Sequence, residues 1–155
     1  MAYLLLKWIH ILSATVLFGT GLGSVFYKYV ADRSGNLQAI AQTNRTVVIA
    51  DCLFTTPTVI IQPLTGILLA RTIGYPFTAP WLVASILLYI IAGLCWLPAV
   101  YLQIRMRNIA LNALTKKVDL SEPYYYYAKI WFWLGVPAFI SMVLVYFLMI
   151  FKPTV

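Results

Sequence analysis

The chain has 155 residues, of which 63% are hydrophobic and 10% are charged, and its formal net charge is +7. A soluble domain of this length could not bury so many apolar side chains, so the composition excludes a soluble globular protein and predicts a single domain, residues 1–155, embedded in a lipid bilayer. The cations lie between apolar runs and form no basic stripe interleaved with aromatic residues, which argues against nucleic acid as a partner.

The first apolar segment covers residues 3–29, which exceeds the roughly 20 helical residues needed to cross a bilayer. It contains Lys7 and His10, the one histidine of the chain. The flexible stem of Lys7 can carry its ammonium group to the interface, whereas His10 lies about one turn deeper and needs a partner inside the protein. At about 100° per residue, the small and polar side chains of this segment share one face. They are Lys7, His10, Ala14, Leu17, Gly21, Ser24 and Lys28.

The second apolar segment covers residues 46–70, and its polar side chains also share one helical face. They are Asp51, Thr55, Thr58, Gln62 and Thr65. Asp51 lies near the start of the segment, at the expected depth of three cations. Because a carboxylate inside a membrane is stable when it is paired, we expect an ion pair with one of these cations rather than a proton-relay role. The candidates are Lys28, Arg45 and Arg105.

The third and fourth apolar segments cover residues 80–104 and 126–151. Each has one face of small and polar side chains: Ser85, Tyr89, Ala92, Trp96, Ala99 and Gln103 in the third, and Gly135, Ala138, Met142 and Met149 in the fourth. Polar groups that point at lipid cost free energy, so we expect the four faces to converge on the interior. Because barrel strands would be about half as long, the sequence predicts an all-α membrane protein with four transmembrane helices in an antiparallel bundle.

The distribution of Lys and Arg predicts the orientation in the membrane. Eight of the 11 cations flank the first and third loops, and three lie on the opposite side. By the positive-inside rule, the two long loops face the cytoplasm and both termini face outward. We therefore expect a multi-pass protein of the bacterial inner membrane, with its termini on the periplasmic side.

His10 is the side chain on which a specific function depends most, and three uses are open for it. It could form a structural hydrogen bond with Gln62 or Tyr89, bind a metal or haem iron, or relay protons. Zinc is disfavoured because no second histidine or cysteine pair supplies further ligands. Haem needs one protein ligand, or a second such as Met142 or Met149, and Trp96 is a further candidate neighbour of such a cofactor.

Several motifs run along nearly the whole chain. They are Lys7-Trp8-Ile9-His10, Gly19-Thr20-Gly21, Asp51 with Phe54-Thr55-Thr56-Pro57, Gln62-Pro63-Leu64-Thr65-Gly66, Pro80-Trp81-Leu82, Cys95-Trp96-Leu97-Pro98 with Gln103, and Gly135-Val136-Pro137-Ala138-Phe139. Together they resemble a bacterial family of predicted integral membrane proteins that is catalogued as a domain of unknown function, DUF2269. The resemblance implies a four-helix membrane protein and no established activity.

The opening Lys-x-x-His pattern is also similar, more distantly, to the haem-b-containing bacterial protoporphyrinogen oxidases and to copper-resistance membrane proteins of the CopD type. In the oxidases the first-span histidine is functional, and the resemblance implies this role for His10. The oxidases also carry a lysine after a Trp-Leu pair, a position that Ser85 occupies here. This departure argues against the oxidase activity and leaves haem binding open.

The resulting functional hypothesis is a four-helix protein that binds haem b through His10 and has an electron-transfer or oxidoreductase-associated role. The sixth ligand of the iron would be Met142 or Met149, unless a homodimer brings two His10 side chains together. One alternative is a non-enzymatic accessory or assembly subunit of a larger membrane complex. Another is a small transporter or copper-handling protein that uses His10 with either methionine as soft ligands.

Overall fold

The computed structural model describes residues 1–153 and is entirely helical over this range. Its elements are α1 (Ala2–Ser34), α2 (Leu37–Ala50), the π-helical turn η1 (Asp51–Thr55), α3 (Thr56–Ile73), α4 (Pro80–Lys116) and α5 (Glu122–Phe151). Because α2, η1 and α3 follow one another without a break, they form one continuous rod, Leu37–Ile73. Within residues 1–153, four helical rods are long and apolar enough to cross a membrane. This confirms the predicted all-α class with four spans.

The helices extend beyond the apolar segments that the sequence defines. α4 has 37 residues, a length of about 55 Å at 1.5 Å per residue, whereas the hydrocarbon core of a bilayer is about 30 Å thick. The charged stretch that follows residue 104 therefore continues α4 as far as Lys116. The first loop is likewise short, because α2 already begins at Leu37.

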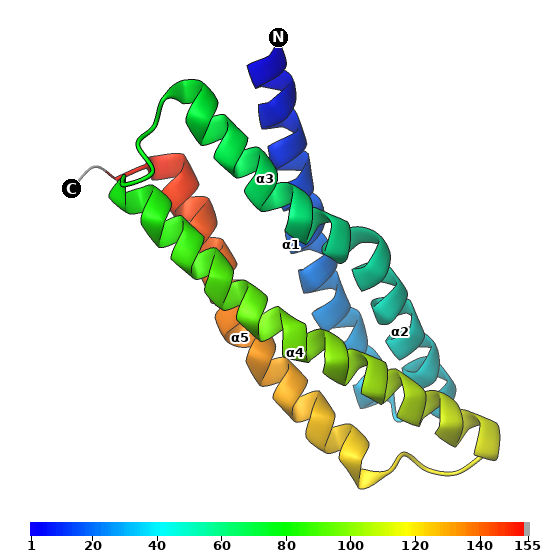
Figure 1. Cartoon of the computed structure of the whole chain (residues 1–155). Coiled ribbons are helices and arrows are strands. Elements are labelled where there is room, and N and C mark those ends of the chain that lie inside the picture. Colours follow the sequence, from blue (N-terminus) through cyan, green and yellow to red (C-terminus); the bar gives the residue numbers. More distant parts are fainter. Residues whose placement is uncertain (154–155) are drawn as a thin grey trace.

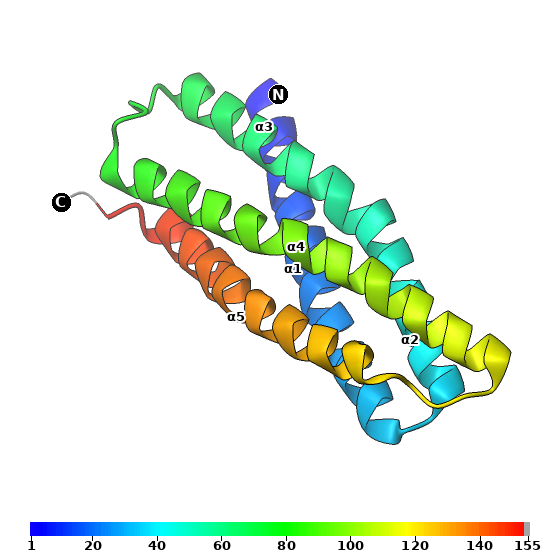
Figure 2. The same cartoon turned by 60° about the horizontal axis from the view of Figure 1, so that its bottom comes forward.

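The helices associate mainly in pairs (Figures 1 and 2). α4 packs along α5, α1 packs against α3 and α2, and α2 packs against α4. Figure 1 shows both termini at one end of the bundle and the connections 34–37 and 117–121 at the other end. At the end that carries the termini, the α1–α3 pair and the α4–α5 pair diverge.

The turn between α1 and α2 is set by two adjacent residues. Gly35 ends α1 with a φ of +64°, a left-handed conformation that glycine adopts without steric cost. Asn36 then caps α2, and its Oδ1 atom accepts hydrogen bonds from the backbone N–H groups of Gln38 at 2.9 Å and Ala39 at 3.2 Å. This tight reversal directs α2 back along α1.

The π-helical turn η1 ends at Thr55, two residues before Pro57. Proline has no N–H and its ring would clash with the carbonyl group four residues earlier, which disfavours a regular α-helical turn at this point. The N–H of Thr56 instead bonds to the carbonyl group of Asp51, five residues earlier. π-helical turns inside α-helices occur frequently at functional sites, which draws attention to the side chains of this turn.

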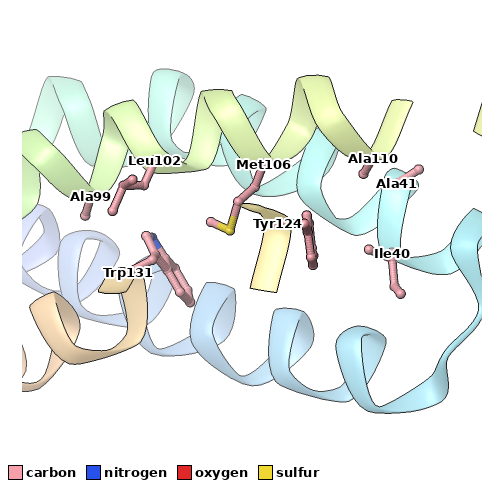
Figure 3. Packing of buried hydrophobic residues seen from close by; sticks show 8 residues of the cluster. All are labelled: Ile40, Ala41, Ala99, Leu102, Met106, Ala110, Tyr124 and Trp131. Carbon is pink, nitrogen blue, oxygen red and sulfur yellow. The ribbon is translucent and has the colours of Figure 1, made fainter. Parts of the chain in front are cut away.

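The main hydrophobic cluster lies at the end of the bundle that holds the two helix connections (Figure 3). It contains Ile40, Ala41, Ala99, Leu102, Met106, Ala110, Tyr124 and Trp131, from α2, α4 and α5. Ala41 and Ala110 are fully buried, and their small size lets α2 approach α4 closely. A smaller cluster of Ala70, Trp81 and Leu82 lies at the opposite end, where α3 and α4 meet the loop between them. These two clusters hold the ends of the bundle together and leave its middle less filled.

Candidate functional site

His10 lies between α1 and α3. Its Nδ1 atom is 2.7 Å from the hydroxyl oxygen of Thr65, and its Nε2 atom is 3.3 Å from Nε2 of Gln62. The ring also faces Gly66, where an added Cβ atom would be 3.3 Å from His10 Cε1. Of the two neighbours considered from the sequence, Gln62 therefore contacts the imidazole, whereas the hydroxyl group of Tyr89 donates to the carbonyl oxygen of Val59 at 2.8 Å.

Thr65 and Gln62 contact the two ring nitrogens of His10. The Thr65 hydroxyl group also lies 2.7 Å from the carbonyl oxygen of Ile61 on its own helix. Because a hydroxyl group can donate and accept, the contact with Nδ1 fits either neutral tautomer of the ring. In both tautomers, His10 joins α1 to α3 through these two polar contacts.

The other residues expected around a cofactor lie against different neighbours. Met149 packs beside the cluster of Trp81 and Leu82. Met142, Tyr89 and Trp96 line a cavity whose walls do not include His10. The structure therefore separates the residues that the sequence grouped around one candidate cofactor.

This cavity has a volume of about 370 Å³ and is bounded by α1, η1, α3, α4 and α5. Glycines on three helices line it, and a Cβ atom added at Gly21, Gly93 or Gly135 would meet nothing within 4 Å. The rest of the wall is mostly apolar and rich in aromatic side chains. These are Phe18, Tyr89, Trp96, Trp131, Phe132 and Phe139.

Three polar side chains, which we call the polar trio, meet at the cavity wall: Asp51, Trp96 and Gln103. The side chains of Gln103 and Trp96 lie within hydrogen-bonding reach of the Asp51 carboxyl group, but neither contact has the geometry of a hydrogen bond. Asp51 Oδ1 accepts a hydrogen bond of 2.8 Å from the Thr55 hydroxyl group. Asp51 Oδ2, Trp96 Nε1 and Gln103 Oε1 are buried and have no hydrogen-bond partner among the described residues. A buried polar group without a partner costs about 1–3 kcal/mol, so these three atoms fit a site that a further molecule completes.

The ion pair expected for Asp51 is not formed among residues 1–153, and this corrects the sequence interpretation. Lys28 bonds instead to Asp32, with 2.6 Å between Nζ and Oδ2. The physical reason is that Asp32 lies one helical turn away on the same face of α1, within easy reach of the Lys28 stem. Arg45 and Arg105 are both exposed, and the Arg105 guanidinium group lies over the ring of Tyr101.

Lys28 belongs to a buried network that the sequence did not suggest. Tyr124 of α5 donates to Asp32 Oδ1 at 2.6 Å and accepts from Lys28 Nζ at 2.9 Å. Its hydroxyl oxygen also accepts from Asn44 of α2 at 2.8 Å. The spacing of Lys28 and Asp32 was the one available signal, since residues four positions apart are neighbours on a helix. The network joins α1, α2 and α5 near the helix connections.

The sequence matches a known protein family over nearly its whole length. Residues 4–153 match the family described as "Predicted integral membrane protein (DUF2269)". The chain belongs to the DUF2269 family. No curated protein and no solved structure matches it.

Membership of the DUF2269 family establishes an integral membrane protein and no activity. The geometry of this family member adds two candidate sites, the His10 contact between α1 and α3 and the cavity with its polar trio. No group of three or more His, Cys, Asp or Glu side chains that could hold a metal ion occurs within residues 1–153. Both sites have buried polar atoms without a partner among the described residues: Oε1 of Gln62 beside His10, and three atoms that meet at the cavity wall.

Proposed function

We propose that this protein binds an amphipathic small molecule, taken from the lipid phase, in the cavity between its four helical rods. The observation that carries the proposal is the meeting of three unpartnered polar atoms, from Asp51, Trp96 and Gln103, at one wall of an otherwise apolar space. Small-molecule sites are typically apolar cavities of about 300–1,000 Å³ with a few convergent polar groups. The cavity, at about 370 Å³, has this size and this character.

Access from the bilayer supports a ligand from the lipid phase. Leu22 of α1 and Ile140 of α5 line the cavity and are 50% and 53% exposed on the outside of the helices. Beside the cavity, α1 and α5 meet through aromatic rings, with the centroids of Phe18 and Phe139 5.1 Å apart. A ligand can therefore enter sideways between α1 and α5, with its polar end directed at the polar trio and its apolar end towards lipid.

Two expectations on location belong to the same proposal. The resemblance to a bacterial family supports the bacterial inner membrane, and the distribution of cations supports termini that face outward. In this orientation Asp51 and Gln103 lie nearer to the cytoplasmic end of the bundle. The polar end of the ligand would then lie in the cytoplasmic half of the membrane.

Haem b bound through His10, with an electron-transfer role, is a second candidate. It is favoured by one observation: Thr65 contacts Nδ1 of His10 at 2.7 Å, and metal-binding histidines typically have a polar partner at the ring nitrogen that does not bind the metal. The residues around His10 do not fit haem in this arrangement, because Gln62 faces Nε2 of His10 and the cavity does not border His10. The same separation of His10 from Met142 and Met149 weighs against a copper site. A purely accessory subunit would leave the polar trio without a role.

A ligand that co-purifies with the protein tests the leading proposal. We would extract the protein in mild detergent and compare wild type, Gly135→Leu and Gly19→Leu by native mass spectrometry. Leucine at position 135 projects into the cavity. Gly19 is exposed, has free space around it and does not line the cavity, so Gly19→Leu is the matched control.

The expected result is one bound lipid-phase molecule per chain in wild type and in Gly19→Leu, and a loss of about tenfold or more in Gly135→Leu. Equal occupancy in the two leucine variants would contradict binding in this cavity. Wild-type protein that carries no molecule, and takes up none when it is incubated with a total lipid extract, would also contradict it.

A further inference from the structure

The chemistry of the polar trio restricts the head group that the cavity can take. Trp96 Nε1 is a donor and Gln103 Oε1 is an acceptor, whereas Asp51 Oδ2 accepts when the carboxyl group is ionised and can donate when it is protonated. A matching head group must therefore both donate and accept hydrogen bonds within a small region. The trio is largely closed to water, because Asp51 is 5% and Gln103 is 6% exposed.

Charged head groups fail this requirement in different ways. The described residues that line the cavity include no Lys, Arg or His. A phosphate or carboxylate group would be buried in this cavity without a compensating cation, at a large cost in free energy. An ammonium group would pair with Asp51, but it has no electron pair to accept from the Trp96 N–H.

A hydroxyl group satisfies the same three atoms without adding charge. One hydroxyl group can accept from Trp96 Nε1 and bond to Asp51 Oδ2, as donor to the carboxylate or as acceptor from the protonated carboxyl group, and a second can donate to Gln103 Oε1. A single water molecule could do the same, so the apolar part of the wall must distinguish the two. That wall contains four aromatic side chains besides Trp96 and Tyr89, a surface that suits a flat ring. They are Phe18, Trp131, Phe132 and Phe139.

We infer that the ligand is a hydroquinone with an apolar tail, whose ring hydroxyl groups bond to the polar trio and whose tail leaves between α1 and α5. This inference rests on the proposed binding function and adds the chemical class of the ligand. The ring lies among the aromatic side chains of α1, α4 and α5. The tail passes Leu22 and Ile140 to reach the lipid.

A series of probes with the same tail tests the head group. We would titrate the purified wild-type protein calorimetrically with decylhydroquinone, kept reduced by ascorbate, and with decylbenzene, 4-decylbenzylamine, 4-decylbenzoic acid and decanol. We would repeat the titrations on Trp96→Phe, which removes Nε1, and on Gln103→Leu, which removes Oε1 and Nε2. Both variants keep most of the side-chain volume. Binding of decylbenzene to these variants shows that the cavity is intact.

The expected result is a dissociation constant for decylhydroquinone at least tenfold below those of all four other probes. Trp96→Phe and Gln103→Leu should each raise the dissociation constant of decylhydroquinone by about tenfold. Each should change the dissociation constant of decylbenzene by less than about twofold. Tighter binding of the amine, or equal binding of decanol, would overturn the assignment. Equal binding of decylhydroquinone and decylbenzene would mean that the polar trio holds water only. If no probe binds, including decylbenzene, the binding function itself fails.

Discussion

The Thr55 hydroxyl group donates a hydrogen bond of 2.8 Å to Oδ1 of Asp51, across the π-helical turn that precedes Pro57. This bond occupies one carboxylate oxygen and leaves Oδ2 directed at the cavity without a partner. The same turn therefore buries the carboxyl group, orients it and keeps one acceptor available. The predictions below test this arrangement and the two other polar contacts that join the helices.

Replacing Thr55 by valine removes the one hydrogen bond of Asp51 and keeps the shape of the side chain. We expect the free energy of unfolding to fall by about 1–3 kcal/mol, because a buried carboxylate loses its partner. Thr58→Val is the control, since the Thr58 hydroxyl group bonds only to carbonyl groups of its own rod. Loss of the Thr58 hydroxyl group should lower the free energy of unfolding by less than about 1 kcal/mol. Thermal unfolding in the same detergent measures both, and equal destabilisation would argue against a special role of the Thr55 bond.

His10→Ala removes the contact with Thr65 and should lower the free energy of unfolding by about 1–3 kcal/mol. Lys7→Ala, on an exposed side chain that extends to the interface, should change it by less than about 0.5 kcal/mol. An absorbance spectrum of the same preparations, expressed with ample haem, tests the second functional candidate. The structural role of His10 predicts a colourless wild-type protein. A Soret band that is lost in His10→Ala and retained in Lys7→Ala would instead support haem binding.

Tyr124→Phe should be among the most destabilising single-atom changes in the chain. The hydroxyl group contacts Lys28, Asp32 and Asn44, and Lys28 is only 1% exposed. We expect a loss of about 2 kcal/mol or more, because buried charged groups lose a hydrogen-bond partner. The neighbouring Tyr125→Phe is the control, since Tyr125 is 59% exposed. Similar unfolding temperatures for the two variants would contradict a stabilising role of this network.

Cysteine labelling tests the orientation. In a background with Cys52→Ser and Cys95→Ser, single cysteines at positions 36 and 117 should react with a membrane-impermeant reagent only after the cells are opened. Thr78→Cys, in the connection between α3 and α4, should react in intact cells. We expect this pattern because Lys and Arg are in excess on the side of the membrane where positions 36 and 117 lie. The reverse pattern would invert the topology.

Much of the fold follows from periodicity and hydropathy. The polar face predicted for the second segment is buried at every position, from Asp51 to Thr65. This works because lipid forces polar side chains towards protein, so a helical face can be recognised without knowledge of its neighbours. The ends of α4 were less predictable, because charged residues outside the bilayer are compatible with both a loop and a helix.

The partner of Asp51 could not be inferred from depth alone. Three cations have a suitable depth, but Lys28 is committed to Asp32 on its own helix and the arginines are exposed. The polar trio was also hidden, although Asp51, Trp96 and Gln103 each lay on a predicted inward face. Hydropathy indicates which face is inward and does not indicate which inward side chains meet, since that depends on the spacing and rotation of the helices.

The hydrogen bond of the Trp96 indole group gives the most direct test of the proposed site. In a ¹H–¹⁵N spectrum of protein with labelled tryptophan, the Trp96 indole signal can be identified by its absence in Trp96→Phe. Addition of decylhydroquinone should move this proton downfield, as a hydrogen bond to the ligand forms, whereas decylbenzene should not. Calorimetric binding of decylhydroquinone with an unchanged Trp96 indole signal would contradict a ligand held by the polar trio.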